Sequence, residues 1–247
     1  MQIDILTLFP EMCDAFLSES IIGRARKAEK VVINCHNIRD YTKNKHNRVD
    51  DTPYGGGMGM IMGVQPVYDC VQAVSKSCNT KPHIVYLSPK GKTFNQQKAI
   101  ELSKLNNLIL LCGHYEGIDE RVLEKVVDEE ISIGDYVLTG GEIGAITVTD
   151  AVCRMLPGVL SDDICFSEES HFDGLLEYPQ YTRPATWQGM DVPEVLLSGH
   201  HANIQKWRHE QSLITTYNKR PEMLEKLELS EDDKKMLKEY IKKSDIK

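Results

Sequence analysis

Residues Glu130–Thr149 read E-I-S-I-G-D-Y-V-L-T-G-G-E-I-G-A-I-T-V-T, with glycines spaced between short runs of β-branched residues. The glycines are Gly134, Gly140, Gly141 and Gly144. Glycine tolerates positive φ and lets the main chain approach a ligand closely. We therefore predict a short strand at Tyr136–Thr139, flanked by glycine turns, that forms a ligand cradle made largely of backbone. The alternative is an ordinary strand with a glycine turn at each end.

Two similar strand-turn units lie upstream of this stretch. His83–Ser88 runs into Pro89, Leu108–Cys112 runs into Gly113, and Ile131–Leu138 brackets Gly134. Short apolar runs of this kind are typical of strands buried in a parallel sheet. Helical stretches are expected between them, near Asn95–Lys104 and Asp119–Val126. Strands that alternate with helices indicate an α/β sheet, in which ligands bind at the carboxyl ends of the strands.

The remaining elements follow from hydrophobic periodicity and from capping residues. We expect strands at Ile3–Phe9 and Val31–Ile38 and helices at Glu11–Lys30, Pro66–Ser77 and Thr147–Leu156. Arg39–Gly63 is long, polar and glycine-rich, which indicates either disorder or a loop that orders on a ligand. Ser161–Asp173 lacks a hydrophobic period and is interpreted as a linker. Beyond it we expect a small all-helical domain, with helices at Ser198–Asn218, from Arg220-Pro221 and from a capping box at Ser230–Asp233.

Composition limits the class of protein. The 247 residues carry a formal net charge of −8, which argues against indiscriminate binding to nucleic acid. Two regions are nevertheless basic: residues 39–48 are locally +3, and residues 201–247 hold 11 Lys/Arg against 9 Asp/Glu. The seven cysteines form no C-x-x-C pair, which favours reduced thiols in a cytoplasmic protein. The sequence predicts neither a signal peptide nor a membrane span.

Two common phosphate-binding motifs are absent. Lys90-Gly91-Lys92-Thr93 contains G-K-T, but the first glycine of a P-loop would fall on Tyr86. No strand end supplies the three glycines of a dinucleotide fingerprint either. Three backbone loops with few positive side chains suit a ligand of little negative charge, such as a nucleoside.

Several long motifs in order resemble one family. They are Tyr54–Met60 (Y-G-G-G-M-G-M), Tyr86–Pro89 (Y-L-S-P), Leu111–Val122 (L-C-G-H-Y-E-G-I-D-E-R-V), Glu129–Glu142, Leu175–Pro184 (L-L-E-Y-P-Q-Y-T-R-P) and Leu196–Arg208. Together they resemble the bacterial tRNA (guanine-N1)-methyltransferases of the SPOUT superfamily. The resemblance implies an α/β SPOUT domain at residues 1–160 with a deep trefoil knot near 84–142. It also implies a linker at 161–174 and a helical tRNA-binding domain at 175–247.

The family transfers methyl from S-adenosylmethionine to N1 of guanosine 37 in tRNA, next to the anticodon. The resemblance therefore implies a tRNA partner with guanosines at positions 36 and 37, a homodimer with a composite active site, and Mg²⁺ by analogy. It implies no resident metal site. The positions that match the family's donor site are Tyr86, Leu87, Ser88, Pro89, Gly113, Tyr115, Glu116, Gly117, Ile133, Gly134, Asp135, Tyr136, Val137, Leu138, Gly140 and Gly141.

The reaction requires two further groups. Guanine N1 carries a proton near neutral pH, so a carboxylate is needed to remove it, and a cation beside O6 would stabilise the developing charge. Arg154 matches the family's arginine. The family's base is an aspartate in a D-S-F motif, where this chain has Glu169-Ser170-His171. We assign Glu169 as the base, with Glu168 as its nearest rival. A second departure is Gly144, where the family often has proline.

Further residues match the family's RNA-contacting regions: Tyr54, Gly55, Gly59, His46, Arg48, Asp50, Ser198, His200, Arg208 and Gln211. Each is equally compatible with a solvated surface group. His114 is interpreted as a variable loop residue. Two other functions are compatible with the motifs: a SPOUT methyltransferase with another RNA target, and a catalytically weak RNA-binding homologue.

Overall fold

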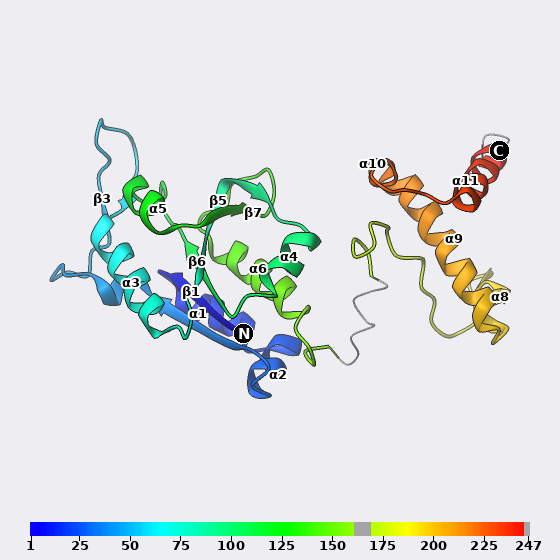
Figure 1. Ribbon diagram of the computed structural model, residues 1–247, viewed down its shortest axis with the longest axis horizontal. Coiled ribbons are helices and arrows are strands. Elements are labelled where there is room, and N and C mark those ends of the chain that lie inside the picture. Colours follow the sequence, from blue (N-terminus) through cyan, green and yellow to red (C-terminus); the bar gives the residue numbers. More distant parts are fainter. Residues whose placement is uncertain (161–168, 245–247) are drawn as a thin grey trace. The chain divides into compact units, whose positions relative to one another are not determined.

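The computed structural model describes residues 1–160 and 169–244, which belong to two compact units, Met1–Asp163 and Ile164–Lys247. The first unit is organised around a five-stranded sheet in which all neighbouring strands are parallel (Figure 1). Across the sheet the strands are β2 (Val32–Asn37), β1 (Gln2–Thr7), β6 (Asn107–Cys112), β5 (His83–Thr93) and β7 (Glu129–Ser132). The parallel sheet confirms the predicted α/β class.

Alternating side chains of the central strands enter two separate cores, because successive residues of a strand point to opposite faces. In β6, Leu108 and Leu110 belong to one core, and Ile109 and Leu111 belong to the other. All four are fully buried. Apolar residues on both faces explain why the strands appear in the sequence as continuous hydrophobic runs.

Helices cover both faces of the sheet. The core containing Leu108 and Leu110 is closed by α1 (Pro10–Leu17), α2 (Ser20–Lys27), α4 (Gln96–Leu102) and α6 (Glu142–Cys153). The other core is closed by α3 (Val64–Ser77), α5 (Glu120–Val126) and the 3-10 helix η1 (Ile38–Tyr41). Between η1 and α3, the two-residue strands β3 (Asp50–Asp51) and β4 (Ile61–Met62) pair antiparallel. The loop between them projects away from its unit (Figure 1).

Several boundaries differ from the expected ones. The strand expected to end at Ser88 continues through Pro89 to Thr93 as β5. The single helix expected at Glu11–Lys30 is broken after Leu17, and α2 packs back on the end of α1. A Cβ on Gly23 would lie 2.0 Å from the Ser18 carbonyl oxygen, so this close approach requires glycine. The helix expected from Thr147 begins at Glu142, five residues earlier.

The strand expected at Tyr136–Thr139 is wrong. After β7 the chain bends, and the Ser132 hydroxyl donates a 2.8 Å hydrogen bond to the Gly134 carbonyl. The Tyr136 amide donates a 2.9 Å hydrogen bond to the same carbonyl. Residues 136–139 pair with no strand among the described residues, and Val137 is 82% exposed. Local hydrogen bonds replace the ladder that its β-branched residues suggested.

The second unit is mainly helical. Its helices are α8 (Glu194–Leu197), α9 (His201–Lys219), α10 (Pro221–Leu224) and α11 (Glu231–Ser244). A small core of Leu175, Leu213 and Leu237 holds α9 and α11 together. The expected all-helical unit also contains one short hairpin, β8 (Thr186–Trp187) with β9 (Met190–Asp191). None of the helices in the described part of the chain has the length and apolar character of a membrane span.

Candidate functional site

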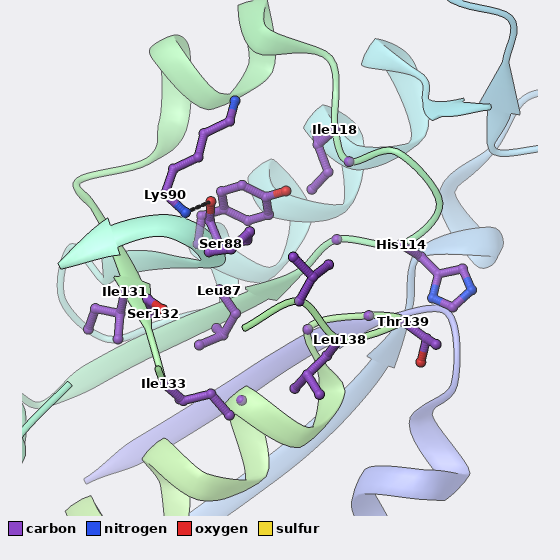
Figure 2. A pocket seen from close by; sticks show the side chains of 18 of the residues that line it. Leu87, Ser88, Lys90, His114, Ile118, Ile131, Ser132, Ile133, Leu138 and Thr139 are labelled. Atoms are coloured by element: carbon purple, nitrogen blue, oxygen red, sulfur yellow. Dashed lines mark hydrogen bonds between the residues drawn. The ribbon is translucent and has the colours of Figure 1, made fainter. Parts of the chain in front are cut away.

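A cavity of about 250 Å³ opens at the carboxyl ends of β5, β6 and β7. Three segments surround it: residues 86–90 of β5, the 113–118 loop after β6, and the 132–141 loop after β7. Figure 2 shows Leu87, Ile133 and Leu138 gathered on one side of the cavity and Ile118 on the other. This is the edge at which a parallel α/β sheet binds ligands.

Backbone hydrogen bonds join the loops after β6 and β7 to each other and to β4. The Gly141 amide donates to the Gly113 carbonyl at 2.9 Å, which joins the start of α6 to the loop after β6. The Glu116 amide donates to Met60 O at 3.0 Å, and the Met62 amide donates to Gly117 O at 2.9 Å. The cavity wall is thereby tied to the chain at β4. Gly59 also lies directly against the Glu116 side chain.

The structure brings together fifteen of the sixteen residues predicted to bind the donor. Only Asp135 is not among the residues that line the cavity. The lining members are Tyr86, Leu87, Ser88, Pro89, Gly113, Tyr115, Glu116, Gly117, Ile133, Gly134, Tyr136, Val137, Leu138, Gly140 and Gly141. Their convergence from three loops is the arrangement expected from the strand-turn units, whereas donor binding itself stays a prediction.

Sequence reasoning missed several lining residues, among them Lys90, His114 and Glu120. Lys90 extends away from Leu87 and Ile133, and its amide is bonded to Ser88 Oγ at 3.1 Å (Figure 2). The His114 ring points away from the cavity and packs edge-on against Phe9. Its Nδ1 is shielded from solvent and has no hydrogen-bond partner among the described residues. Lys90 directly follows the Tyr86–Pro89 motif, and the other two lie within the 111–122 motif, so the motifs already indicated their neighbourhood.

Burial and nearby carboxylates set the electrostatics of the site. Burial, together with the charges of Glu130 and Glu120, raises the pKa of Tyr86 to about 12, so its phenol stays neutral at ordinary pH. Glu142 is only 4% exposed, lies in the first turn of α6 and accepts a 2.7 Å hydrogen bond from the Thr7 hydroxyl. Burial, and then the charge of Glu142, raises the pKa of Cys112 well above its usual value. The thiol is therefore protonated.

The two predicted catalytic residues belong to different units. Arg154 is half-buried and forms the C-cap of α6. Glu169 is half-buried at the start of the described part of the second unit, where its carbonyl accepts from the Phe172 amide at 3.3 Å. Glu168, the rival base, lies outside the described residues.

The predicted RNA-contacting residues lie on both units. In the first, Tyr54 is fully exposed in the loop between β3 and β4, with Gly55 beside it; His46 and Arg48 are exposed, and Asp50 opens β3. In the second, Ser198 and His200 are exposed before α9, and Gln211 is half-buried within it. Arg208 stacks over the Tyr178 ring at 4.8 Å.

The cavity wall combines an apolar surface with a few charged groups, Lys90, Glu116 and Glu120. The wall is largely main chain and aliphatic side chain, and the carboxylates Glu116 and Glu120 lie at its lining. A carboxylate favours a nearby positive charge. Among the residues that the structure describes, no cluster of three or more His, Cys, Asp or Glu is arranged to hold a metal ion.

Comparisons with known proteins assign the family. The sequence model described as tRNA (Guanine-1)-methyltransferase TrmD matches residues 1–226. A relative from Ruminiclostridium cellulolyticum, named tRNA (guanine-N(1)-)-methyltransferase, is 61% identical over 92% of this chain and 97% of its own length. Relatives of the same name from Clostridium botulinum and Staphylococcus aureus are 57% and 52% identical, over 98% and 97% of this chain and 100% and 97% of their own lengths. The chain therefore belongs to the TrmD family of tRNA (guanine-1)-methyltransferases.

Proposed function

We propose that the protein transfers a methyl group from S-adenosylmethionine to N1 of guanosine 37 in tRNA, next to the anticodon. The observation that carries the proposal is the convergence of the three predicted donor loops on one cavity in a chain of the TrmD family. The cavity lies at the sheet edge where nucleoside ligands bind in α/β folds.

The lining residues fit S-adenosylmethionine. Leu87, Ile133 and Leu138 offer an apolar surface for an adenine ring, and main-chain groups of the loops offer hydrogen bonds to its edge. Glu116 and Glu120 favour the positive charges of the amino acid part. When bound, the donor supplies an electrophilic methyl group on a sulfonium sulfur.

The chain itself has to prepare guanine N1. In this proposal the Glu169 carboxylate takes the N1 proton, so that the nitrogen lone pair is available for attack. The Arg154 guanidinium lies beside O6 and stabilises the negative charge that moves there. Tyr86, a neutral phenol near pH 7 whose pKa is raised further by burial, adds no competing charge to the cavity.

A homodimer is part of the proposal. Met12 and Phe16 lie one turn apart on α1, Phe9 is its N-cap residue, and each of the three is between 42% and 57% exposed. Ile143, on α6, is 46% exposed, and α6 packs against α1. Large apolar side chains gathered on one helix pair are typical of a surface covered by a partner. A second copy of the chain is the occupant that the family resemblance implies.

The family resemblance also supports a knot, a tRNA-binding unit and a requirement for Mg²⁺. The chain from 84 to 142 is threaded as a trefoil knot, consistent with the contact between Gly113 and Gly141. The unit that holds α9 and α11 binds tRNA through residues such as Arg208. An experimental trace of residues 84–142 tests the knot, and an unthreaded path would contradict it.

Activity is also proposed to depend on Mg²⁺. Methyl-transfer assays in the presence of a chelator, with and without added Mg²⁺, would measure this dependence.

The functional test uses purified protein, labelled S-adenosylmethionine and a tRNA transcript with guanosines at positions 36 and 37. A matched transcript with position 37 changed serves as the control. We expect label in the first transcript only. Label in both would discard position 37, and label in neither, with donor binding intact by calorimetry, would favour an inactive RNA-binding homologue.

A further inference from the structure

The hairpin formed by β8 and β9 presents an exposed tryptophan that the proposed chemistry does not use. Trp187 is 58% exposed, and Met190, directly opposite in the register, is 59% exposed. Residues directly opposite in an antiparallel pair lie on the same face. The indole and the thioether therefore form one apolar platform, which we call the Trp187 platform.

The platform is held by a regular tight turn. Its two central residues, Gln188 and Gly189, have φ of 51° and 79°, and positive φ at both positions is the signature of the type I′ turn that matches strand twist. Thr186 Oγ1 donates to Asp191 Oδ1 at 2.6 Å on the opposite face. The Val192 amide donates to Ala185 O at 2.8 Å and extends the ladder. The turn and the ladder thus fix the backbone at Trp187 and the face of the hairpin on which its side chain lies.

Size and charge favour a nucleobase over a protein surface as the occupant. A stable protein interface buries about 800 Å² on each partner, far more than one indole and one thioether offer, whereas one base matches an indole face. Between Tyr178 and Asp191 the only charged residues are Arg183 and Asp191. Asp191 is bonded on the face away from the platform, and Arg183 is exposed. A polyanion can therefore approach the platform without meeting the Asp191 carboxylate.

We infer that Trp187 is a stacking site for an unpaired nucleobase of the bound tRNA, separate from the base that is methylated. This inference rests on the proposed tRNA substrate. Sequence-tolerant stacking of unpaired bases on aromatic side chains is the usual way proteins hold splayed RNA. The site would orient the tRNA and would take no part in methyl transfer.

Tryptophan fluorescence tests the inference directly, because the chain has only two tryptophans, Trp187 and Trp207. In Trp207→Phe, Trp187 is the sole indole, and the phenyl ring keeps an aromatic contact with Tyr181. Saturating tRNA should quench the Trp187 emission by at least half and reduce its access to acrylamide about threefold or more. Unchanged emission and access would overturn the inference. So would an indole already shielded without tRNA, since a protein surface would then cover it.

Binding of the full-length variants separates stacking from general hydrophobic contact. A base–aromatic stack is worth on the order of 1–3 kcal/mol, and 1.4 kcal/mol is a factor of ten in Kd. Trp187→Ala and Trp187→Leu should each weaken tRNA binding about tenfold, and Trp187→Tyr should restore it to within about threefold. The salt dependence should be unchanged, because no phosphate contact is lost. Equal affinity in the Leu and Tyr variants, or a lower salt slope in the Ala variant, would contradict stacking.

Wild-type protein run beside the variants separates the two proposals. If wild type methylates tRNA while the Trp187 emission of the Trp207→Phe variant does not change with tRNA, only the stacking site is wrong. If wild type neither binds nor methylates tRNA, the proposed function and the stacking site both fail. Melting curves that match wild type establish that each variant is folded.

Discussion

Glu169 and Arg154 are the residues on which the proposed chemistry depends. Glu169→Gln keeps the shape of the side chain but cannot take the N1 proton, so we expect methyl transfer to fall by about 10²–10⁴-fold. Arg154→Ala removes the cation at O6 and should cost about 10²–10³-fold. Single-turnover rates with saturating donor and tRNA are the measurement. Wild-type rates in either variant would remove that residue from the mechanism.

Asp4 is a buried carboxylate that the sequence analysis did not predict to be important. It is 1% exposed in the middle of β1 and accepts hydrogen bonds from Gln2 Nε2 at 2.7 Å, Asn34 Nδ2 at 2.9 Å and His36 Nε2 at 2.8 Å. Burial alone would raise its pKa, but the bonds from His36, Asn34 and Gln2 together outweigh burial. The pKa of Asp4 is therefore below its usual value of 3.8.

The free energy of unfolding should depend on pH through the ionisation of Asp4. Because the folded pKa is depressed, the contribution of Asp4 is complete above the unfolded pKa and is lost as pH falls through the folded pKa, that is, below about pH 4. Asp4→Asn should lower the free energy of unfolding by about 2–4 kcal/mol at pH 7, with a smaller difference in acid. Urea unfolding at several pH values measures this. Asp14→Asn, at an exposed ion pair with Arg26, is the control and should cost under about 1 kcal/mol.

The start of α6 is the element that closes the cavity, and it depends on glycine. A Cβ on Gly141 would lie 2.8 Å from the Cys112 Cα, which is backbone and cannot move aside cheaply. Gly141→Ala should therefore lower the free energy of unfolding by about 1–3 kcal/mol and weaken donor binding in calorimetry. In Gly144→Ala the nearest atoms to the new methyl would be side-chain atoms of Leu87, at 3.2–3.6 Å, which can shift more easily than backbone, so its unfolding free energy should fall less than in Gly141→Ala. Equal stabilities for both variants would contradict this packing.

The elements also show how far sequence reasoning reached. Apolar runs located β5 and β6, and the period of Val67, Cys70, Val71 and Val74 located α3, since these residues are buried as expected. In the glycine-rich stretch, composition led to the wrong prediction of a strand at Tyr136–Thr139. Residues 136–139 have strand-like side chains but no neighbouring strand to pair with in the described chain. The α6 start was missed because Gly141 caps the helix without a side-chain hydrogen bond.

The candidate site was predictable for a related reason. The three segments around the cavity were located because apolar runs end at proline or glycine, and the individual residues were taken from the family resemblance. Lys90 and His114 were missed because their place at the cavity depends on where the main chain turns. Arg154 and Glu169 belong to different units, and their proposed roles were taken from the family resemblance and not from local sequence.

We expect two copies of the whole molecule to associate as a homodimer. Phe16 is 57% exposed on the apolar face of α1. A charge there would have to be desolvated on association, so Phe16→Glu should shift a dimer to a monomer in sedimentation. Val64→Glu, on α3 at the opposite face of the sheet, is the matched control and should stay dimeric. A monomeric wild type, or a Phe16→Glu protein that remains dimeric, would remove this face as the interface.

The identity of the methylated nucleoside tests the central claim most directly. Purified protein, S-adenosylmethionine and a tRNA with guanosine at position 37 would be incubated, and the tRNA digested and analysed by liquid chromatography with mass spectrometry. We expect 1-methylguanosine, located to position 37 by fragment mapping and absent when the donor is omitted. Another methylated nucleoside, or unmodified tRNA from protein that binds the donor, would contradict it.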